Sequence, residues 1–226
     1  SFHNMDGNFY QLDLLAEIDR AEGLPVRGRI PFHMKNFMKL ADLEKASEMH
    51  RRYHTERLRS GFVKMFMDGV IDSGTAVMAG AYAGPPSKNG DPLFTAEQFN
   101  EIAIDVDRRG LQIAVHAIGD GAVNSVLNGY EAAARANGKR DSRHRIEHIE
   151  VVLASDIARF AELGVVASMQ PPHPPGTMGL PLEPTLGLIG EARWPLSYAW
   201  QTLRDAGARL AFASDWPVSD INVMRG

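Results

Sequence analysis

The amino-acid sequence predicts an α/β protein built as a (β/α)8 barrel of the TIM type, with about six of the eight strand–helix units present. Amphipathic helical stretches that end at a glycine alternate with short β-rich runs. Glycine after a helix allows the left-handed conformation that ends it, and repeated alternation of helix and strand is typical of a parallel sheet. The β-rich runs, in chain order, are PVRGRIPF, FVKMFMDG, LQIAVHAIG, RHRIEHIEV, VVASMQP and ARLAFASD.

The segments between these runs can also be placed. Thr95 and Gln98 can form a capping box, which predicts the start of one helix. The segment MHRRYHTERLR, which precedes the second run, is typical of a solvated helix face. Two long connections follow strands and should therefore line the catalytic face as lids or substrate walls. The expected helices cover about residues 95–109, 121–137, 155–163 and 197–206, and the long connections about 69–94 and 170–193.

The placement of polar residues separates a barrel from a doubly wound sheet, which would show the same alternation. No GxGxxG motif follows the first strand. Polar side chains instead lie at the C-terminal ends of four or five different strands, where barrel enzymes carry their catalytic groups. Six units are two fewer than eight. We therefore expect residues 1–226 to form a partial barrel domain, with the first strands upstream of Ser1.

Composition excludes several classes of function. Lys and Arg are scattered and the net charge is −4, so nucleic acid is not an expected partner. No apolar run has the length of a membrane span, and the N-terminus lacks the apolar region of a signal peptide, which fits a cytoplasmic location. The sequence contains no cysteine. Any metal site must therefore use His, Asp, Glu or a modified Lys.

Four residues near strand ends are candidate metal ligands, and each also has a structural interpretation. Lys64 lies in an apolar strand, where a cation needs a lowered pKa or a partner such as Asp68. His116 and His148 are either ligands or core histidines. Asp215 is either a ligand or a cap for the next element. His33 also ends a strand, and we expect it to be structural.

The combination favours a metal site. Imidazole nitrogen and carboxylate oxygen are ligands of zinc, and the ends of separate parallel strands converge at one barrel mouth. An apolar strand helps to keep a lysine amine neutral. A neutral Lys64 could react with carbon dioxide to form a carbamate, which is an anion able to bridge two metals. We therefore expect one or two Zn²⁺ ions, or another divalent metal, at this mouth.

Several motifs of the chain resemble the amidohydrolase superfamily. VKMFMDG, AVHAIGD, RIEH and ASDWPV, in this order, resemble it, and most of all its YtcJ-like branch (amidohydrolase family 3), which includes N-substituted formamide deformylases. SMQPPH, followed by YAWQTLRDAGARLAF, also resembles that branch. The resemblance implies that Lys64 is a carboxylated, metal-bridging lysine and that His116 and His148 bind the second metal. It implies that Asp215 binds the first metal and acts as general base and acid. It also places Gln170 and His173 near the substrate.

One departure concerns the first metal. The family carries an HxH motif on its first barrel strand, and this sequence contains none. The resemblance therefore implies that these ligands lie upstream of Ser1, with a β-sandwich domain formed by both ends of a longer chain. We expect the site of the present chain to be incomplete by itself.

The expected activity is hydrolysis of a non-peptide amide C–N bond, such as that of an N-formyl or cyclic amide, in a small molecule. Two alternatives stay open. One is a non-catalytic binding or regulatory relative. The other is a different metal-dependent barrel enzyme, such as an ester or phosphotriester hydrolase or a decarboxylase. The resemblance also suggests a homodimer.

Overall fold

The computed structural model describes residues 1–85 and 89–223. All strand pairs within its sheets are parallel. The first sheet has the order β1 (Phe2–His3), β2 (Gly28–Arg29) and β4 (Leu58–Arg59). The second has the order β3 (Phe32–His33), β5 (Phe62–Phe66), β6 (Gln112–Ala117), β7 (Arg145–His148), β8 (Val166–Met169) and β9 (Arg209–Phe212).

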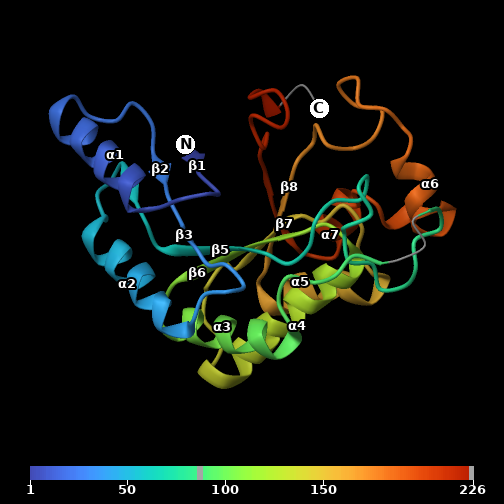
Figure 1. Cartoon of the computed structure of the whole chain (residues 1–226), viewed down its shortest axis with the longest axis horizontal. Coiled ribbons are helices and arrows are strands. Elements are labelled where there is room, and N and C mark those ends of the chain that lie inside the picture. The colour runs from blue at the N-terminus through green and yellow to red at the C-terminus, as the bar shows by residue number, and fades with distance from the viewer. Residues whose placement is uncertain (86–88, 224–226) are drawn as a thin grey trace.

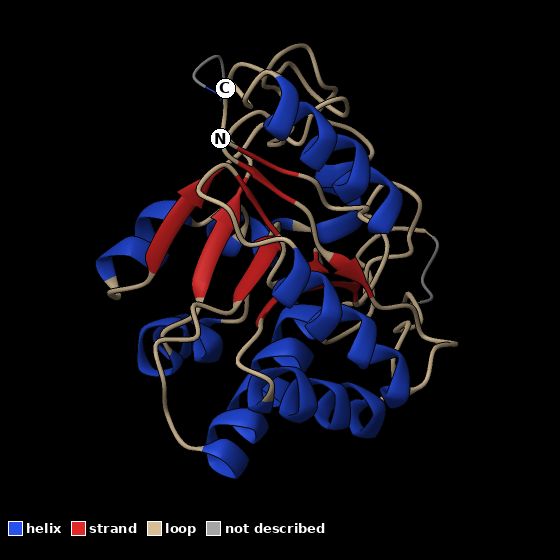
Figure 2. Ribbon diagram, turned by 90° about the vertical axis from the view of Figure 1, so that its left-hand side faces the viewer, coloured by secondary structure: helices blue, strands red, loops and turns tan. Residues whose placement is uncertain are grey.

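The two sheets are parts of one layer of strands. Only Ile30 and Pro31 separate β2 from β3, and only Ser60 and Gly61 separate β4 from β5. When each of these pairs is counted as one position, seven strand positions follow one another in chain order. A doubly wound sheet reverses its order at a switch point, whereas barrel strands keep chain order. The structure is therefore a partial (β/α)8 barrel, and Figure 2 shows its strands running side by side in one direction.

Helices cover one face of this layer. Helices α3, α4 and α5 lie along the same side of the central strands (Figure 1). In the described part of the chain, no helix is both long enough and apolar enough to cross a membrane. The α-helices are α1 (Phe9–Ala21), α2 (Leu43–Arg52), α3 (Ala96–Arg108), α4 (Asp120–Asn137), α5 (Ile157–Leu163), α6 (Thr185–Ile189) and α7 (Trp200–Asp205), and the 3-10 helices are η1 (Leu40–Asp42), η2 (Ala154–Asp156) and η3 (Glu191–Leu196).

The strand register separates an apolar face from a polar one. Paired residues of parallel strands point to the same face of a sheet, and neighbours along a strand point to opposite faces. Met65 pairs with Val115 and belongs to the apolar core shared with α3 and α4. Phe66 pairs with His116, His116 with Glu147, and Glu147 with Ser168. Phe66, His116, Glu147 and Ser168 therefore form a row across the strands, on the face turned away from the helical core.

Most of the expected elements are present. Each of the six β-rich runs contains a strand, and Thr95 and Gln98 form the predicted capping box. The helix expected before Gly61 was placed wrongly, because α2 ends at Arg52 and a tight turn follows. In that turn the Thr55 hydroxyl accepts a hydrogen bond from the Leu58 amide at 2.9 Å, which leads into β4. Strand β1 was not predicted, because two residues are too few to show an apolar alternation.

The two long connections pack against each other beyond the strand ends. Tyr82 of the first and Leu188 of the second belong to one small apolar cluster. The Ala83 amide donates to the Leu188 carbonyl at 2.9 Å. Arg193 donates to the Ala81 carbonyl at 3.1 Å and pairs with Asp120 at 3.4 Å. These contacts join the connections that follow β5 and β8 into one unit.

A buried polar cluster fastens the opposite end of the layer. His144 accepts a hydrogen bond from the Ile113 amide through Nδ1 at 3.1 Å, so its Nε2 donates to Asp107 of α3, also at 3.1 Å. Asp107 also pairs with Arg140 at 2.7 Å and accepts from Asn137 at 2.9 Å. Burial alone raises the pKa of Asp107, but the hydrogen bonds from His144 and Asn137 and the Arg140 charge outweigh it and lower the pKa to about 2.

Replacing Asp107→Ala should lower the free energy of unfolding by about 3 kcal/mol, because the buried His144 and the partly exposed Arg140 lose their acceptor. The comparison is urea unfolding against Asp141→Ala, which removes an exposed carboxylate and should change stability little. Because the pKa of Asp107 is depressed, its contribution is present above pH 4 and disappears as pH falls toward 2. Equal losses in both variants would show that the buried cluster does not stabilise the fold.

Candidate metal centre at the strand ends

A continuous arc of rings lines the polar face of the strand layer. Its members come from β3, β5, β6, β7 and the connection after β8, and successive ring centroids lie 5.4, 4.9, 4.5 and 5.7 Å apart. Asp215, which follows β9, extends the series, because its Oδ2 lies 3.6 Å from the last imidazole. We call this set the ring arc, and its members in order are His33, Phe66, His116, His148 and His173.

Three side chains of this region form a group suited to a divalent metal. One ligand atom each from His148, His173 and Asp215 lies within 4.8 Å of the other two. His148 Nδ1 and His173 Nε2 are buried and make no hydrogen bond in the described structure. Buried polar atoms are rarely left without a partner, and two imidazoles with one carboxylate are a common donor set for zinc. The residues present therefore fit a metal ion.

The backbone aims two of these side chains in an unusual way. His148 has φ +79° and Asp215 has φ +57°, which is the left-handed region that residues other than glycine seldom adopt. Such conformations are costly and cluster at functional sites. Each lies where the chain leaves a strand, so the turn redirects the side chain away from the regular alternation of the sheet.

His116 lies next to the group but has a partner already. Its ring is 4.5 Å from that of His148, and its Nε2 donates to the Gly69 carbonyl at 2.9 Å. Burial, reinforced by the Lys64 charge, lowers the pKa of His116 to about 4. Burial also holds the pKa of His148 well below its usual value. Both rings are therefore neutral at pH 7, which is the form that binds a metal.

Lys64 is buried in the middle of β5. Its side chain is almost fully enclosed, with Nζ 3.5 Å from the Phe66 ring centroid and donating to the Met65 carbonyl at 3.0 Å. Burial lowers the pKa of Lys64 to about 7, although the negative charges of Glu147 and Asp215 oppose this shift. A large fraction of this amine is therefore neutral at pH 7.

Asp68 has a structural role that could not be assigned from its position in the sequence. It accepts hydrogen bonds from the amides of Val77, Ile118 and Gly119 at 2.9–3.0 Å, and its Oδ1 lies 3.6 Å from His116 Nε2. Burial raises its pKa to about 7 against the effect of these donors. Asp68 thus fixes the loop after β5 to the loop after β6, beside His116.

Two neighbours of His173 complete the description. Glu150 Oε1 lies 3.8 Å from His173 Nδ1, on the side of the ring away from Asp215. Gln170, at the end of β8, is buried, and its Oε1 makes no hydrogen bond in the described structure. Sequence reasoning placed Gln170 and His173 near the substrate but passed over Glu150, whose position in RIEHIE gives no signal of its own.

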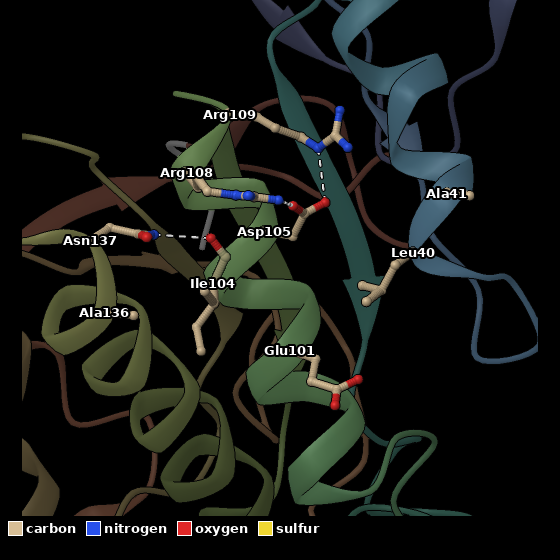
Figure 3. A pocket seen from close by; sticks show the side chains of 9 residues that line it. All are labelled: Leu40, Ala41, Glu101, Ile104, Asp105, Arg108, Arg109, Ala136 and Asn137. Carbon is tan, nitrogen blue, oxygen red and sulfur yellow. Dashed lines mark hydrogen bonds and ion pairs between the residues drawn. The ribbon is translucent and has the colours of Figure 1, made fainter.

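A groove on the helical side of the molecule is separate from the ring arc. It has a volume of about 630 Å³ and lies at the outer surfaces of η1, α3 and the end of α4 (Figure 3). Two of its charged residues, Arg108 and Arg109, pair with Asp105, Arg109 at 2.9 Å. The strand ends therefore remain the candidate functional site.

A family model described as the amidohydrolase family matches residues 3–226. The chain is 35% identical over 212 residues to Protein LONG AFTER FAR-RED 3 of Arabidopsis thaliana, covering 93% of this chain and 35% of that protein. It is 27% identical over 230 residues to a protein described as putative amidohydrolase YtcJ of Bacillus subtilis (strain 168), covering 99% of this chain and 41% of that protein. It is 26% identical over 202 residues to an N-substituted formamide deformylase of Arthrobacter pascens, covering 84% of this chain and 35% of that protein.

The fold has a close counterpart among solved structures. An uncharacterized metal-dependent hydrolase from Pyrococcus furiosus superposes with a TM-score of 0.80 at 27% identity, over 98% of this chain and 43% of that one. The chain thus spans less than half the length of each of these four proteins. The order of its strand-end motifs, its parallel barrel strands and the extent of these matches agree: the chain belongs to the amidohydrolase family, as its sequence motifs predicted.

Proposed function

We propose that the protein is a metal-dependent hydrolase that cleaves an amide-type C–N bond other than a peptide bond, with zinc as its metal. The observation that carries this proposal is the group of His148, His173 and Asp215, in which two buried imidazole nitrogens make no hydrogen bond with the described residues. Support for the bond type comes from the relative described as an N-substituted formamide deformylase. An N-substituted formamide is therefore the first substrate class to test.

The metal would be held by Lys64, His116, His148 and Asp215, and the geometry adds His173 to these candidates. When bound, a divalent metal polarises the amide carbonyl and makes water nucleophilic at neutral pH. Asp215 is partly exposed at the end of β9, so it can accept the proton of the attacking water and return it to the leaving nitrogen. His173 Nε2, beside Asp215, would either bind the metal or stabilise negative charge on the substrate oxygen.

In this proposal Lys64 acts as a carbamate. The neutral amine attacks carbon dioxide, its nitrogen loses a proton to solvent, and the product is an anion. The apolar surroundings that lower the pKa of Lys64 to about 7 favour the first step. Phe66 covers the amine and limits its access to water.

A non-catalytic binding or regulatory function is the second candidate. It is favoured by the 35% identity to Protein LONG AFTER FAR-RED 3, whose name states no reaction. This candidate requires no bound metal and no turnover, so metal analysis separates the two.

Zinc content is the first prediction for the full-length protein. His148→Ala should lower the affinity for Zn²⁺ by more than about 100-fold, since even residues that only orient ligands contribute 10- to 100-fold. The measurement is elemental analysis after dialysis at set zinc concentrations. His54→Ala, which removes an exposed histidine, is the control. If His116→Ala loses zinc and His173→Ala retains it, His116 is the ligand next to His148. If His173→Ala loses zinc and His116→Ala retains it, His173 is that ligand. Equal zinc in His148→Ala and the control would reject this centre.

Asp215→Asn should retain zinc but reduce kcat by about 10²- to 10⁴-fold, because the amide cannot accept the proton. Initial rates on a panel of formamides, esters and phosphotriesters would measure this loss. Faster turnover of an ester or a phosphotriester would contradict the C–N assignment. Normal turnover by the variant would remove Asp215 from the role of base.

Carbon dioxide should add to Lys64 more readily as pH rises through 7, because only the neutral amine reacts and its pKa is about 7. Native mass spectrometry in bicarbonate buffer would follow the mass of one carbon dioxide, and Lys64→Arg should show none. The extent of addition should level off above about pH 8. Addition that is independent of pH, or that persists in the variant, would contradict the assignment.

A further inference from the structure

His33 belongs to the ring arc although sequence reasoning assigned it a structural role. It ends β3 and pairs in register with Lys64 of β5, so both side chains lie on the polar face of the strands. Its ring is 5.4 Å from that of Phe66, the same ring that covers the Lys64 amine. His33 therefore lies on the wall of the candidate site that β3 and β5 form, while Asp215 lies beyond β9.

Asp6 holds the ring of His33 in one orientation. His33 Nδ1 lies 2.9 Å from Asp6 Oδ1. Because a carboxylate oxygen accepts hydrogen bonds, Nδ1 carries the ring proton, and Nε2 of the neutral ring is an acceptor. No hydrogen bond to Nε2 is present among residues 1–85 and 89–223. The side chain is 15% exposed, so Nε2 is accessible on a ring that is otherwise enclosed.

A close backbone approach places Asp6 beside His33. Gly7 is buried, and a Cβ at this position would lie 2.5 Å from both the Ile30 side chain and the Pro31 carbonyl. Those two residues lead directly into β3. Only glycine therefore lets the segment that carries Asp6 press against the start of the strand that carries His33.

The other histidines of the ring arc have contacts or roles of their own. His116 Nε2 donates to the Gly69 carbonyl. His148, His173 and Asp215 form the candidate metal group. His33 is thus a histidine of the arc that lies outside the metal group and, among residues 1–85 and 89–223, keeps a ring nitrogen without a hydrogen bond.

We propose that His33, oriented by Asp6, accepts a hydrogen bond from the N–H of the amide that is cleaved, so that the site selects amides bearing a hydrogen on nitrogen. This inference rests on the proposed hydrolase function. An amide N–H lies in the plane of the amide, whereas the nitrogen lone pair that receives a proton develops perpendicular to it. An acceptor for the N–H and a donor to the lone pair therefore approach the nitrogen from different directions.

The test uses formanilide, which carries an N–H, and N-methylformanilide, which does not. The quantity measured is the ratio of kcat/KM for the two amides with the zinc-loaded, full-length protein. His33→Phe keeps a ring against Phe66 but removes the acceptor. It should reduce the preference for formanilide about tenfold, the effect of one hydrogen bond in a partly buried site. His33→Gln, whose carbonyl oxygen can take the place of Nε2, should restore part of the preference.

Two controls make the result specific. His54→Phe changes an exposed histidine and should leave the ratio unchanged. Zinc content should be the same in wild type and in both His33 variants, since His33 is outside the metal group. An unchanged ratio in His33→Phe, or equal losses on both amides, would overturn the proposal.

Binding separates failure of this inference from failure of the proposed function. Calorimetry on the metal-free, full-length protein gives dissociation constants for both amides without turnover. A tenfold loss of selectivity in His33→Phe would support the hydrogen bond even if the zinc-loaded enzyme hydrolysed neither amide. Unchanged selectivity in binding would overturn it, whatever the activity.

Discussion

The register of the parallel strands is the constraint on which the rest of this structure depends. A shift of one residue would exchange the two faces of a strand. The observed register sets Lys64, Phe66 and His116 on one face while Met65 and Val115 pack into the helical core. The order of the strands then brings residues more than a hundred positions apart to one mouth. Every chemical property of the candidate site follows from this arrangement.

Burial at that mouth prepares the side chains for metal binding. The same apolar surroundings lower the pKa values of Lys64, His116 and His148, and each shift favours the neutral form. Neutral imidazole binds metal and a neutral amine reacts with carbon dioxide. The cost is that polar atoms such as His148 Nδ1 lose water without gaining a hydrogen bond in the described structure. A bound metal would offset this cost, which couples the stability of the site to its occupancy.

Much of the fold could be predicted from the sequence because its signals are local. Apolar runs marked the strands, and the Thr95 capping box marked the start of α3. Two features were not predicted from the sequence. Strand β1 is too short to carry a pattern. The turn that follows α2 depends on a hydrogen bond from the Leu58 amide to the Thr55 hydroxyl. The packing of the two long connections also could not be predicted, because loop contacts such as Ala83 with Leu188 leave no periodic signal.

The sequence by itself determined the parallel barrel and the family, because alternation and motif order are properties of the chain alone. It also predicted Lys64, His116, His148 and Asp215 as candidate ligands. Only the tertiary structure decided which groups meet. It joined His173 to His148 and Asp215, tied His116 to the Gly69 carbonyl, and brought Asp6 to His33. These pairings depend on distances between separate strands and on backbone turns, and no spacing along the chain encodes either of them.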